Sequence, residues 1–237
     1  MQQPELNVVI PVYNEQGAIN VVLDKWVEEF NRLQVNFNIH VYNDGSKDNT
    51  LSILQEYASG NNKVVVHDKL NSGHGSTILQ GYRENINSEW LFQIDSDDEM
   101  SPESFEKLWI KRNEYDFLIG SRTERNNPLS RKLITMFSRL TVWGLYGKAV
   151  KDVNSPYRLM KTSAFKDYYS LIPPDTFAPN VIISGICGMK KLKVYEIEAN
   201  YKFRTTGEVS IKKFKLFKSA LKSFIQTILF RFKIIGK

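Results

Sequence analysis

The chain has 237 residues, of which 42% are hydrophobic and 24% charged, and its formal net charge at pH 7 is +6. This composition is that of a globular protein and excludes disordered, collagen-like and solenoid classes. The single cysteine excludes an internal disulfide, and neither a membrane-spanning apolar run nor a signal peptide is recognisable, so we expect a cytoplasmic protein.

Strands and helices alternate through the first half of the chain. Apolar, β-branched runs predict strands, and apolar residues spaced by three and four predict helices between them. The predicted strands are 6–13, 37–43, 64–67, 90–94 and 117–120, and the predicted helices are 18–33, 51–58, 77–86 and 102–112. This alternation predicts a doubly wound, mostly parallel α/β sheet, whose ligands bind beyond the carboxyl ends of the strands.

After residue 120 the alternation is less regular. We expect helices at 129–147 and 178–189 and short strands at 157–160 and 192–197. No internal repeat or low-complexity linker divides this part from the first half. Residues 1–210 are therefore predicted to form one domain.

The last segment, residues 211–237, predicts a basic amphipathic helix. Lysines cluster at its start, and one stripe of apolar residues follows helical spacing: Phe214, Phe217, Leu221, Phe224, Ile228, Phe232 and Ile235. Such a helix suits the surface of an anionic membrane. The alternative is a helix that packs against the domain or against a partner subunit.

Residues 95–99, DSDDE, place four carboxylates directly after a predicted strand. These groups repel one another unless a cation neutralises them. Alternate residues such as Asp95 and Asp97 can converge on one pocket, and hard oxygen ligands suit Mg²⁺ or Mn²⁺, which would bridge the phosphates of a substrate. The alternative is a solvated acidic loop that caps the helix after Ser101.

Five motifs occur in a fixed order, each near the end of a predicted strand: VVIPVYNE (8–15), YNDGSKDNT (42–50), NSGHGS (71–76), DSDDEMSP (95–102) and IGSR (119–122). Together they resemble the family 2 glycosyltransferases of the GT-A fold, in particular the polyprenyl-phosphate branch of dolichyl-phosphate mannose synthase-like enzymes. The resemblance covers about residues 6–215. It implies a nucleotide-binding half at 1–120 and an acceptor half at 121–210.

The resemblance also implies roles for individual residues. The donor, a UDP- or GDP-linked sugar, would contact Pro11, Tyr13, Glu15, Asp44, Gly75, Asp95 and Arg204. Asp44 would bind the nucleobase, with Asn43 standing where the family often has another aspartate. Asp95-Ser-Asp97 matches the DXD motif, so Asp97 would bind Mg²⁺ or Mn²⁺. Glu99, which stands where the branch often has glutamine, would be a second metal ligand.

The distribution of charge agrees with a phosphate acceptor. Residues 1–116 carry 9 Lys and Arg against 19 Asp and Glu, residues 117–207 carry 15 against 6, and residues 208–237 carry 8 against 1. The acidic first half argues against binding of nucleic acid. Arginine forks suit phosphate, and by resemblance the acceptor phosphate would contact Arg122, Arg131 and, as a further candidate, Arg158. Asp95, Asp97, Arg122 and Arg131 are the expected catalytic residues.

A general base is not apparent in the expected place. Related enzymes often carry an acid near the start of the helix predicted at 178–189, where this chain has Asn180, although Asp175 lies close in sequence. A phosphate acceptor is already anionic and needs no base. We therefore expect an inverting, metal-dependent transfer of a hexose to a polyprenyl phosphate.

Two other functions remain open at this stage. One is a family 2 transferase that extends a glycan at a sugar hydroxyl, and the other is a subunit that binds a nucleotide-sugar without turnover. The expected location is the cytoplasmic face of a membrane, reached through residues 211–237. Many relatives in this branch continue into transmembrane helices, so we also expect that a separate integral membrane subunit could supply this part.

Overall fold

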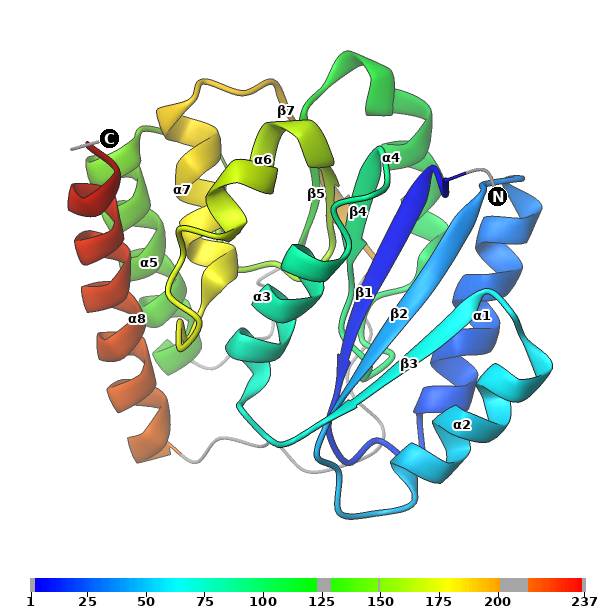
Figure 1. Ribbon diagram of the computed structural model, residues 1–237. Coiled ribbons are helices and arrows are strands. Elements are labelled where there is room, and N and C mark those ends of the chain that lie inside the picture. The colour runs from blue at the N-terminus through cyan, green and yellow to red at the C-terminus, as the bar shows by residue number, and fades with distance from the viewer. Residues whose placement is uncertain (1–2, 123–128, 149, 201–212, 236–237) are drawn as a thin grey trace.

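The computed structural model describes residues 3–122, 129–148, 150–200 and 213–235. Within them the chain forms one seven-stranded sheet in the order β3-β2-β1-β4-β6-β5-β7, with helices on both of its faces (Figure 1). The expected α/β architecture is therefore confirmed. The domain boundary expected at residue 210 lies outside the described residues.

The strands of the first half are parallel to one another where they pair, as predicted. They are β1 (Leu6–Val12), β2 (Phe37–Asp44), β3 (Val64–Lys69), β4 (Trp90–Gln93) and β5 (Phe117–Arg122). β1 and β4 are buried along their whole length. Helices cover both faces of these two strands, which explains why their sequences are nearly continuous apolar runs.

The helices of the first half follow the predicted order. They are α1 (Ile19–Arg32), α2 (Thr50–Gly60), α3 (His74–Glu84) and α4 (Phe105–Lys111), the last flanked by 3₁₀ turns at Pro102–Ser104 and Arg112–Glu114. α3 begins three residues earlier than predicted. Gly73 precedes it with φ of 90°, a conformation that glycine adopts readily, and this turn brings the start of the helix to the carboxyl end of the sheet.

The second half adds two differently oriented strands. Its elements are α5 (Leu129–Tyr146), β6 (Arg158–Lys161), α6 (Thr162–Tyr169), α7 (Pro179–Met189) and β7 (Val194–Ala199). β6 is antiparallel to both β4 and β5, whereas β7 is parallel to β5. The short helix α6 was not predicted, because eight residues hold too few apolar repeats to distinguish a helix from a loop.

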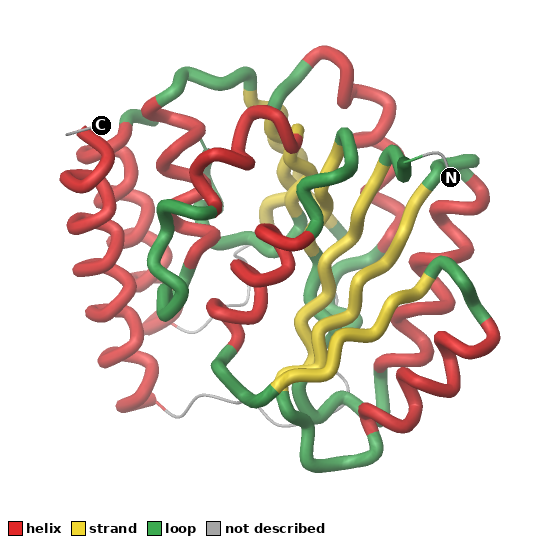
Figure 2. The backbone as a smooth tube through the Cα atoms, in the orientation of Figure 1, coloured by secondary structure: helices red, strands yellow, loops and turns green. Residues whose placement is uncertain are grey.

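Helices lie on both faces of the sheet (Figure 2), and a hydrophobic core fills the space on each face. The first joins the sheet to α1, α2 and α4 and is rich in aromatic rings around Trp26. The second joins the sheet to α3, α6 and α7 and includes residues of α5 and α8. The sheet is thus covered on both sides, and the loops at its carboxyl edge are left to form a site.

The C-terminal helix α8 (Lys213–Ile235) lies beside α5 and α7 (Figure 1). Its buried contacts come from Ser223, Thr227 and Phe230, and the Tyr146 hydroxyl donates to the Thr227 carbonyl oxygen at 2.6 Å. Several residues of the predicted apolar stripe remain exposed, among them Phe224 and Phe232. None of the helices in the described ranges is long and apolar enough to cross a membrane.

Two histidines form a pair between the neighbouring strands β2 and β3. His40 Nδ1 lies 3.1 Å from His67 Nε2, and His40 Nε2 is buried without a partner among the described residues. Burial, together with the positive charge that His67 can carry, lowers the pKa of His40 from 6.5 to about 4. The folded protein therefore resists protonation at His40 in a range where the unfolded chain accepts it.

We expect this pair to make the protein less stable as the pH falls below the ordinary pKa of histidine, 6.5. Between about pH 6.5 and pH 4 the unfolded state binds the proton and the folded state does not, so the free energy of unfolding decreases as pH decreases. From about pH 7.5 to pH 5 the loss attributable to His40 should be about 2 kcal/mol. Urea unfolding at the two pH values measures it. The loss should be smaller in His40→Gln, and an equal loss in both proteins would contradict the expectation.

Candidate functional site

The loops that follow β1 and β2 are braced against each other at the carboxyl edge of the sheet. The Asn14 backbone N–H donates to Ser46 Oγ at 3.0 Å, and the Lys47 backbone N–H donates in return to Asn14 Oδ1 at 2.7 Å. The Glu15 backbone N–H donates to Thr50 Oγ1 at 2.9 Å. These bonds hold the backbone of Asn14 at φ of 54° and give the two loops one rigid arrangement.

The three candidate donor residues of the first loop differ in exposure. Pro11 is buried inside β1, in register with Tyr42 of β2. Tyr13 is 38% exposed, which leaves its ring available to a ligand, and Glu15 is partly buried. The structure therefore gives Pro11 a place in the sheet, while Tyr13 and Glu15 lie in the loop beyond it.

Asp44, at the end of β2, is 4% exposed and is held by neighbouring groups. Its carboxylate accepts a hydrogen bond from Lys69 Nζ and from the backbone N–H groups of Ser72 and Gly73, at 2.8 and 2.9 Å. Burial opposes ionisation, but the bonds and charge of Lys69 and the Ser72 N–H outweigh it and hold the pKa of Asp44 below its usual value. Asp44 thus orders the loop that leads into α3.

Gly75 packs against another loop of the protein. A Cβ atom at this position would lie 2.1 Å from the carbonyl oxygen of Phe177 and 2.4 Å from that of Thr176. Only glycine allows α3 to approach the segment before α7 so closely. On the side where a Cβ would lie, the space beside Gly75 is filled by the chain itself.

The carboxylates of the acidic loop after β4 have different neighbours. Asp98, with φ of 57°, pairs with Lys25 of α1 at 2.5 Å between Nζ and Oδ2. Asp97 accepts the Glu99 backbone N–H at 3.2 Å, and both side chains are partly exposed. Asp95 lies next to α3, with its Oδ1 atom 3.6 Å from Nε2 of His74. By resemblance, the other three carboxylates were given roles and Asp98 was given none.

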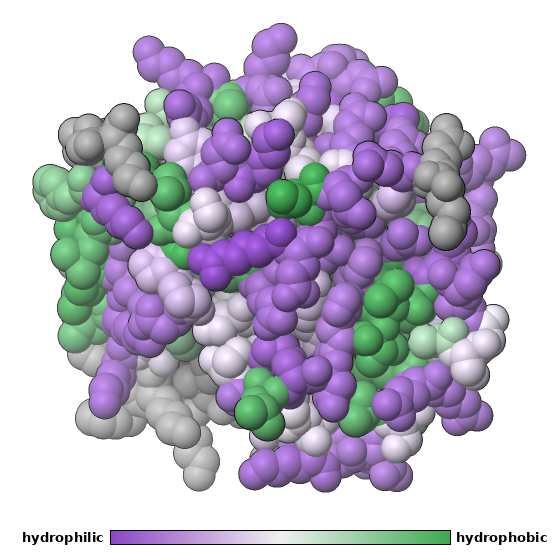
Figure 3. Space-filling model, in the orientation of Figure 1, coloured by the Kyte–Doolittle hydropathy of each residue, from purple (hydrophilic) through white to green (hydrophobic). Residues whose placement is uncertain are grey.

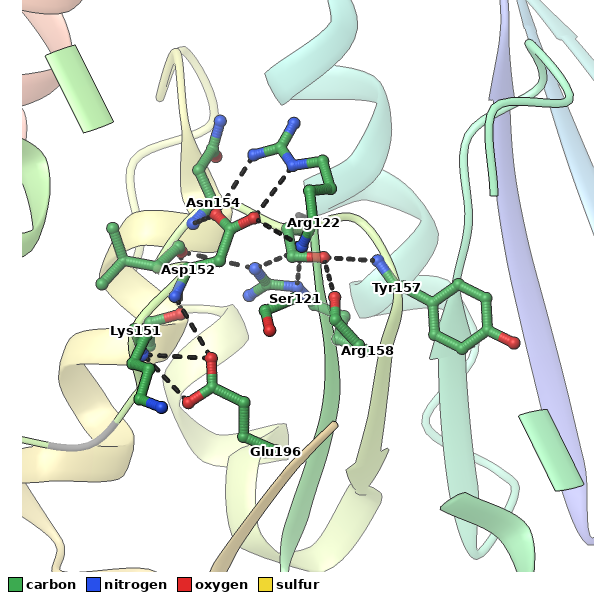
Figure 4. A network of polar contacts seen from close by, with 12 residues as sticks. Ser121, Arg122, Lys151, Asp152, Asn154, Tyr157, Arg158 and Glu196 are labelled. Carbon is green, nitrogen blue, oxygen red and sulfur yellow. Dashed lines mark hydrogen bonds and ion pairs between the residues drawn. The ribbon is translucent and has the colours of Figure 1, made fainter. Parts of the chain in front are cut away.

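Arg122, at the end of β5, forms a two-point ion pair with Asp152 (Figure 4). Its Nε donates to Oδ2 at 2.9 Å and its Nη2 to Oδ1 at 3.1 Å. Asp152 is 8% exposed, and although burial raises its pKa, the neighbouring guanidinium outweighs burial and keeps the pKa below its usual value. Glu196 of β7 accepts hydrogen bonds from the backbone N–H groups of Lys151 and Asp152, so the loop around Asp152 is fixed.

The pairing partners of two site residues escaped the sequence argument. Asp152 stands thirty positions after Arg122, and no local pattern joins them. Lys69 lies beyond the predicted strand 64–67 and was given no role, although a lysine at the carboxyl end of a strand can neutralise an aspartate on the neighbouring parallel strand. The register pairs Asp44 with Lys69 directly.

Arg158 lies in the interior, which corrects its expected role. It is 0% exposed, and its guanidinium donates to the backbone carbonyl oxygens of Ser155 and Asn180 at 2.5–3.0 Å. An acceptor phosphate requires an accessible arginine, so this position assigns Arg158 to the support of the loops around β6. The sequence could not reveal this, because an arginine on a strand is exposed far more often than it is buried.

Two other arginines cannot be placed in the site. Arg204 lies outside the described residues, and for Arg131 only the backbone, near the start of α5, is described. Asp175, the alternative base, is exposed, and its carboxylate lies 3.6 Å from Lys222 Nζ of α8. Gln226 of the same helix accepts the Phe177 backbone N–H at 2.8 Å, so α8 is tied to the segment that packs on Gly75.

The chain is similar in sequence to a known protein family. The family model described as Glycosyl transferase family 2 matches residues 7–169. An undecaprenyl-phosphate 4-deoxy-4-formamido-L-arabinose transferase from Pectobacterium atrosepticum is 24% identical over 234 residues, which cover 98% of this chain and 71% of that relative.

Two solved structures have the same architecture. Mannosyl-3-phosphoglycerate synthase from Rubrobacter xylanophilus matches with a TM-score of 0.68 at 10% identity, over 98% of this chain and 75% of that one. Glucosyl-3-phosphoglycerate synthase from Mycobacterium tuberculosis, in complex with Mn²⁺, UDP and glucosyl-3-phosphoglycerate, matches with a TM-score of 0.65 at 16% identity, over 96% and 80%. At these identities the likeness concerns the fold, and the expected GT-A fold is confirmed.

Proposed function

The chain belongs to glycosyltransferase family 2, and on this premise we propose that it transfers a sugar from a nucleotide-diphosphate sugar to the phosphate of a polyprenyl phosphate. The observation that carries the proposal is the match, over 98% of the chain, to a relative whose name specifies undecaprenyl phosphate. The sequence led us to expect a hexose. Because the name of that relative specifies an arabinose derivative, a five-carbon sugar, the proposal does not specify whether the transferred sugar has five or six carbons.

The donor is proposed to lie across the loops after β1, β2 and β4. The partly exposed Tyr13 ring would pack near the nucleobase, and Asp95 would contact the ribose or the sugar. Asp44 would reach the base while it orders the loop before α3. A solved relative of the same fold is in complex with UDP, which supports a uridine nucleotide as the first donor to test.

Asp97 and Glu99 are proposed to hold a divalent cation, which would complete the donor site. Mg²⁺ typically takes one or two protein carboxylates and completes its shell with phosphate oxygens and water. The described residues contain no group of three or more potential ligand side chains, and the support for this cation is that Asp97 and Glu99 are partly exposed carboxylates just after β4. When bound, the cation neutralises charge on the departing diphosphate.

The acceptor phosphate is proposed to attack without a general base. One of its oxygens forms a bond to the anomeric carbon, the bond from that carbon to the nucleotide diphosphate breaks, and the configuration inverts. Asn180 supports this proposal because it is 4% exposed and hydrogen-bonded in the interior, where it cannot take a proton from an acceptor. Arg122 and Arg131 would bind the acceptor phosphate, and Asp152 would hold the Arg122 fork in place.

Binding to a membrane surface is proposed to bring the enzyme to its lipid acceptor. The outward side of α8 carries Leu221, Phe224, Ile225, Leu229 and Phe232, which are 43–64% exposed, and α5 beside it exposes Phe137 and Leu140. Figure 3 shows the hydrophobic residues gathered along the edge of the molecule formed by α8. The same helix exposes Lys218 and Lys222, which suits an anionic surface.

Charged substitutions on the outward side of α8 should weaken binding to anionic vesicles. Leu229 and Phe232 are 62% and 64% exposed, so Leu229→Glu and Phe232→Glu should leave the fold intact. Each should lower co-sedimentation with phosphatidylglycerol vesicles by roughly tenfold or more, because a buried side chain of this size contributes about 1.5–3 kcal/mol. Ile110→Glu is the matched control, since Ile110 is 65% exposed on α4. Equal binding by all four proteins would contradict the membrane role.

The proposed function is tested with a panel of donors and acceptors. Purified protein with Mn²⁺ is incubated with UDP- or GDP-linked sugars and undecaprenyl phosphate, and the lipid product is identified by mass spectrometry. A sugar joined to the lipid phosphate is the expected product. Transfer to simple sugar hydroxyls without any lipid product would favour the glycan-extending alternative, and binding of donor without product would favour a non-catalytic subunit.

A further inference from the structure

A buried polar cluster lies directly beneath the acidic loop and joins three elements. Tyr82 of α3, Gln93 of β4 and Asn180 of α7 are 0%, 0% and 4% exposed. The Tyr82 hydroxyl lies 2.8 Å from Gln93 Oε1 and 2.7 Å from Asn180 Oδ1, and Asn180 Nδ2 donates to Gln93 Oε1 at 2.7 Å. Gln93 Nε2 in turn donates to Asp95 Oδ1 at 3.2 Å. The cluster thus ends on Asp95, which is proposed to contact the nucleotide-sugar.

The donors and acceptors of this cluster allow one orientation of Gln93. Its Oε1 atom faces Asn180 Nδ2, which can only donate, and the Tyr82 hydroxyl. If the amide turned over, two NH₂ groups would meet at Asn180, and a carbonyl oxygen would face the Asp95 carboxylate. Both contacts are repulsive, and buried polar groups left unpaired are costly. With Asn180 oriented as its bond to Gln93 Oε1 requires, Gln93 therefore presents its NH₂ group to Asp95.

We infer that Gln93 is a positioning residue for donor binding, and that Tyr82 and Asn180 act through it. A hydrogen bond from an immobile amide fixes the Asp95 side chain in one orientation. Among the described residues, the contacts of Asp95 fall on Oδ1, from Gln93 and from His74, so Oδ2 is the oxygen presented to the ribose hydroxyls of the donor nucleotide. Such supporting groups typically change affinity or activity by roughly ten- to a hundredfold. The inference rests on the donor role proposed for Asp95.

The cluster makes a prediction about how substitutions combine. Tyr82→Phe leaves Asn180 Nδ2 on Gln93 Oε1, and Asn180→Leu leaves the Tyr82 hydroxyl there, so each single variant keeps one restraint on the amide. The double variant removes both and lets Gln93 turn over. We expect UDP affinity, measured by calorimetry with Mn²⁺, to fall little in each single variant. It should fall by roughly tenfold in the double variant and in Gln93→Met.

The matched control is Asn85→Leu. Asn85 is also a buried asparagine, 2% exposed, and its amide donates to the Tyr42 hydroxyl and the Gly81 carbonyl oxygen, away from Asp95. It should lose stability as Asn180→Leu does and keep its UDP affinity. All titrations are made below the melting transition of each variant, so loss of folded protein does not affect the measured UDP affinity. In turnover with the identified donor, the KM for donor should rise more than kcat falls.

Asp95→Ala separates the inference from the function on which it rests. Reduced UDP affinity in Asp95→Ala together with wild-type affinity in Gln93→Met and in the Tyr82→Phe/Asn180→Leu double variant would overturn the inference alone. Wild-type affinity in Asp95→Ala would overturn the donor role of Asp95 and the inference with it. Effects of Tyr82→Phe and Asn180→Leu that simply add would also contradict a shared action through Gln93.

Discussion

Replacing Asp97 by asparagine is expected to lower the rate of sugar transfer by roughly a hundredfold to a thousandfold, the range found when a group that stabilises transition-state charge is removed. Negative charge develops on the nucleotide diphosphate as it departs, and Asp97 is proposed to hold the cation that neutralises it. The side chain is partly exposed beyond the end of β4, where a donor can reach it. The measurement is the initial rate of nucleotide release at saturating Mn²⁺ and polyprenyl phosphate.

Asp98 provides the matched control, one position along the chain. Its carboxylate pairs with Lys25 of α1, so it points away from the proposed cation. Asp98→Asn removes the same charge from the same loop, and asparagine tolerates the φ of 57° found there. Most of the activity should remain, because a partly exposed ion pair contributes about 1 kcal/mol or less. Equal losses in the two variants would mean that only the total charge of the loop matters, contrary to the role assigned to Asp97.

The second large effect is expected at the ion pair between Asp44 and Lys69. Their side chains are 5% and 14% exposed, so removal of one partner leaves a buried charge without its counterpart. Lys69→Met and Asp44→Asn are each expected to lower the free energy of unfolding by about 3 to 5 kcal/mol at neutral pH. Asp44 also accepts the Ser72 and Gly73 N–H groups, so the loop before α3 should loosen in Asp44→Asn.

The double variant measures the coupling between the two residues. Once Lys69 is methionine, loss of the Asp44 charge should cost much less, so the double variant should be more stable than the sum of the single effects implies. Urea unfolding of all four proteins gives the cycle. The pKa of Asp44 is held below its usual value, so the contribution of the pair persists at neutral pH and is lost only as the pH falls through that lowered value. Strictly additive losses would contradict a direct pair.

Most elements of the first half could be predicted from the sequence, because strands covered on both faces and helices covered on one leave distinct periodicities. β1 and α1 end within one residue of their predicted limits. The start of α3 could not be located, since it depends on the turn at Gly73 and on contact of Gly75 with the segment before α7. The antiparallel direction of β6 likewise depends on its neighbours, β4 and β5.

The sequence predicted which loops lie at the carboxyl edge of the sheet, but not which side chains in them contact one another. Motifs at strand ends located the loops around Asp44 and Asp95, because parallel strands bring their carboxyl ends to one edge. Which side chains are free for ligands depends on partners distant in the sequence, such as Lys25 for Asp98 and the backbone carbonyls for Arg158. These pairings arise only from tertiary packing, and they changed the interpretation of Arg158.

The most direct test of the central proposal compares two acceptors that differ by one phosphate group. Nucleotide release from the donor is measured with undecaprenyl phosphate and with undecaprenol, at equal concentrations in the same vesicles with Mn²⁺. The account predicts release that depends on undecaprenyl phosphate and is absent with the alcohol, because only the phosphate can attack without a base. Equal release with both lipids, or release without either, would contradict it.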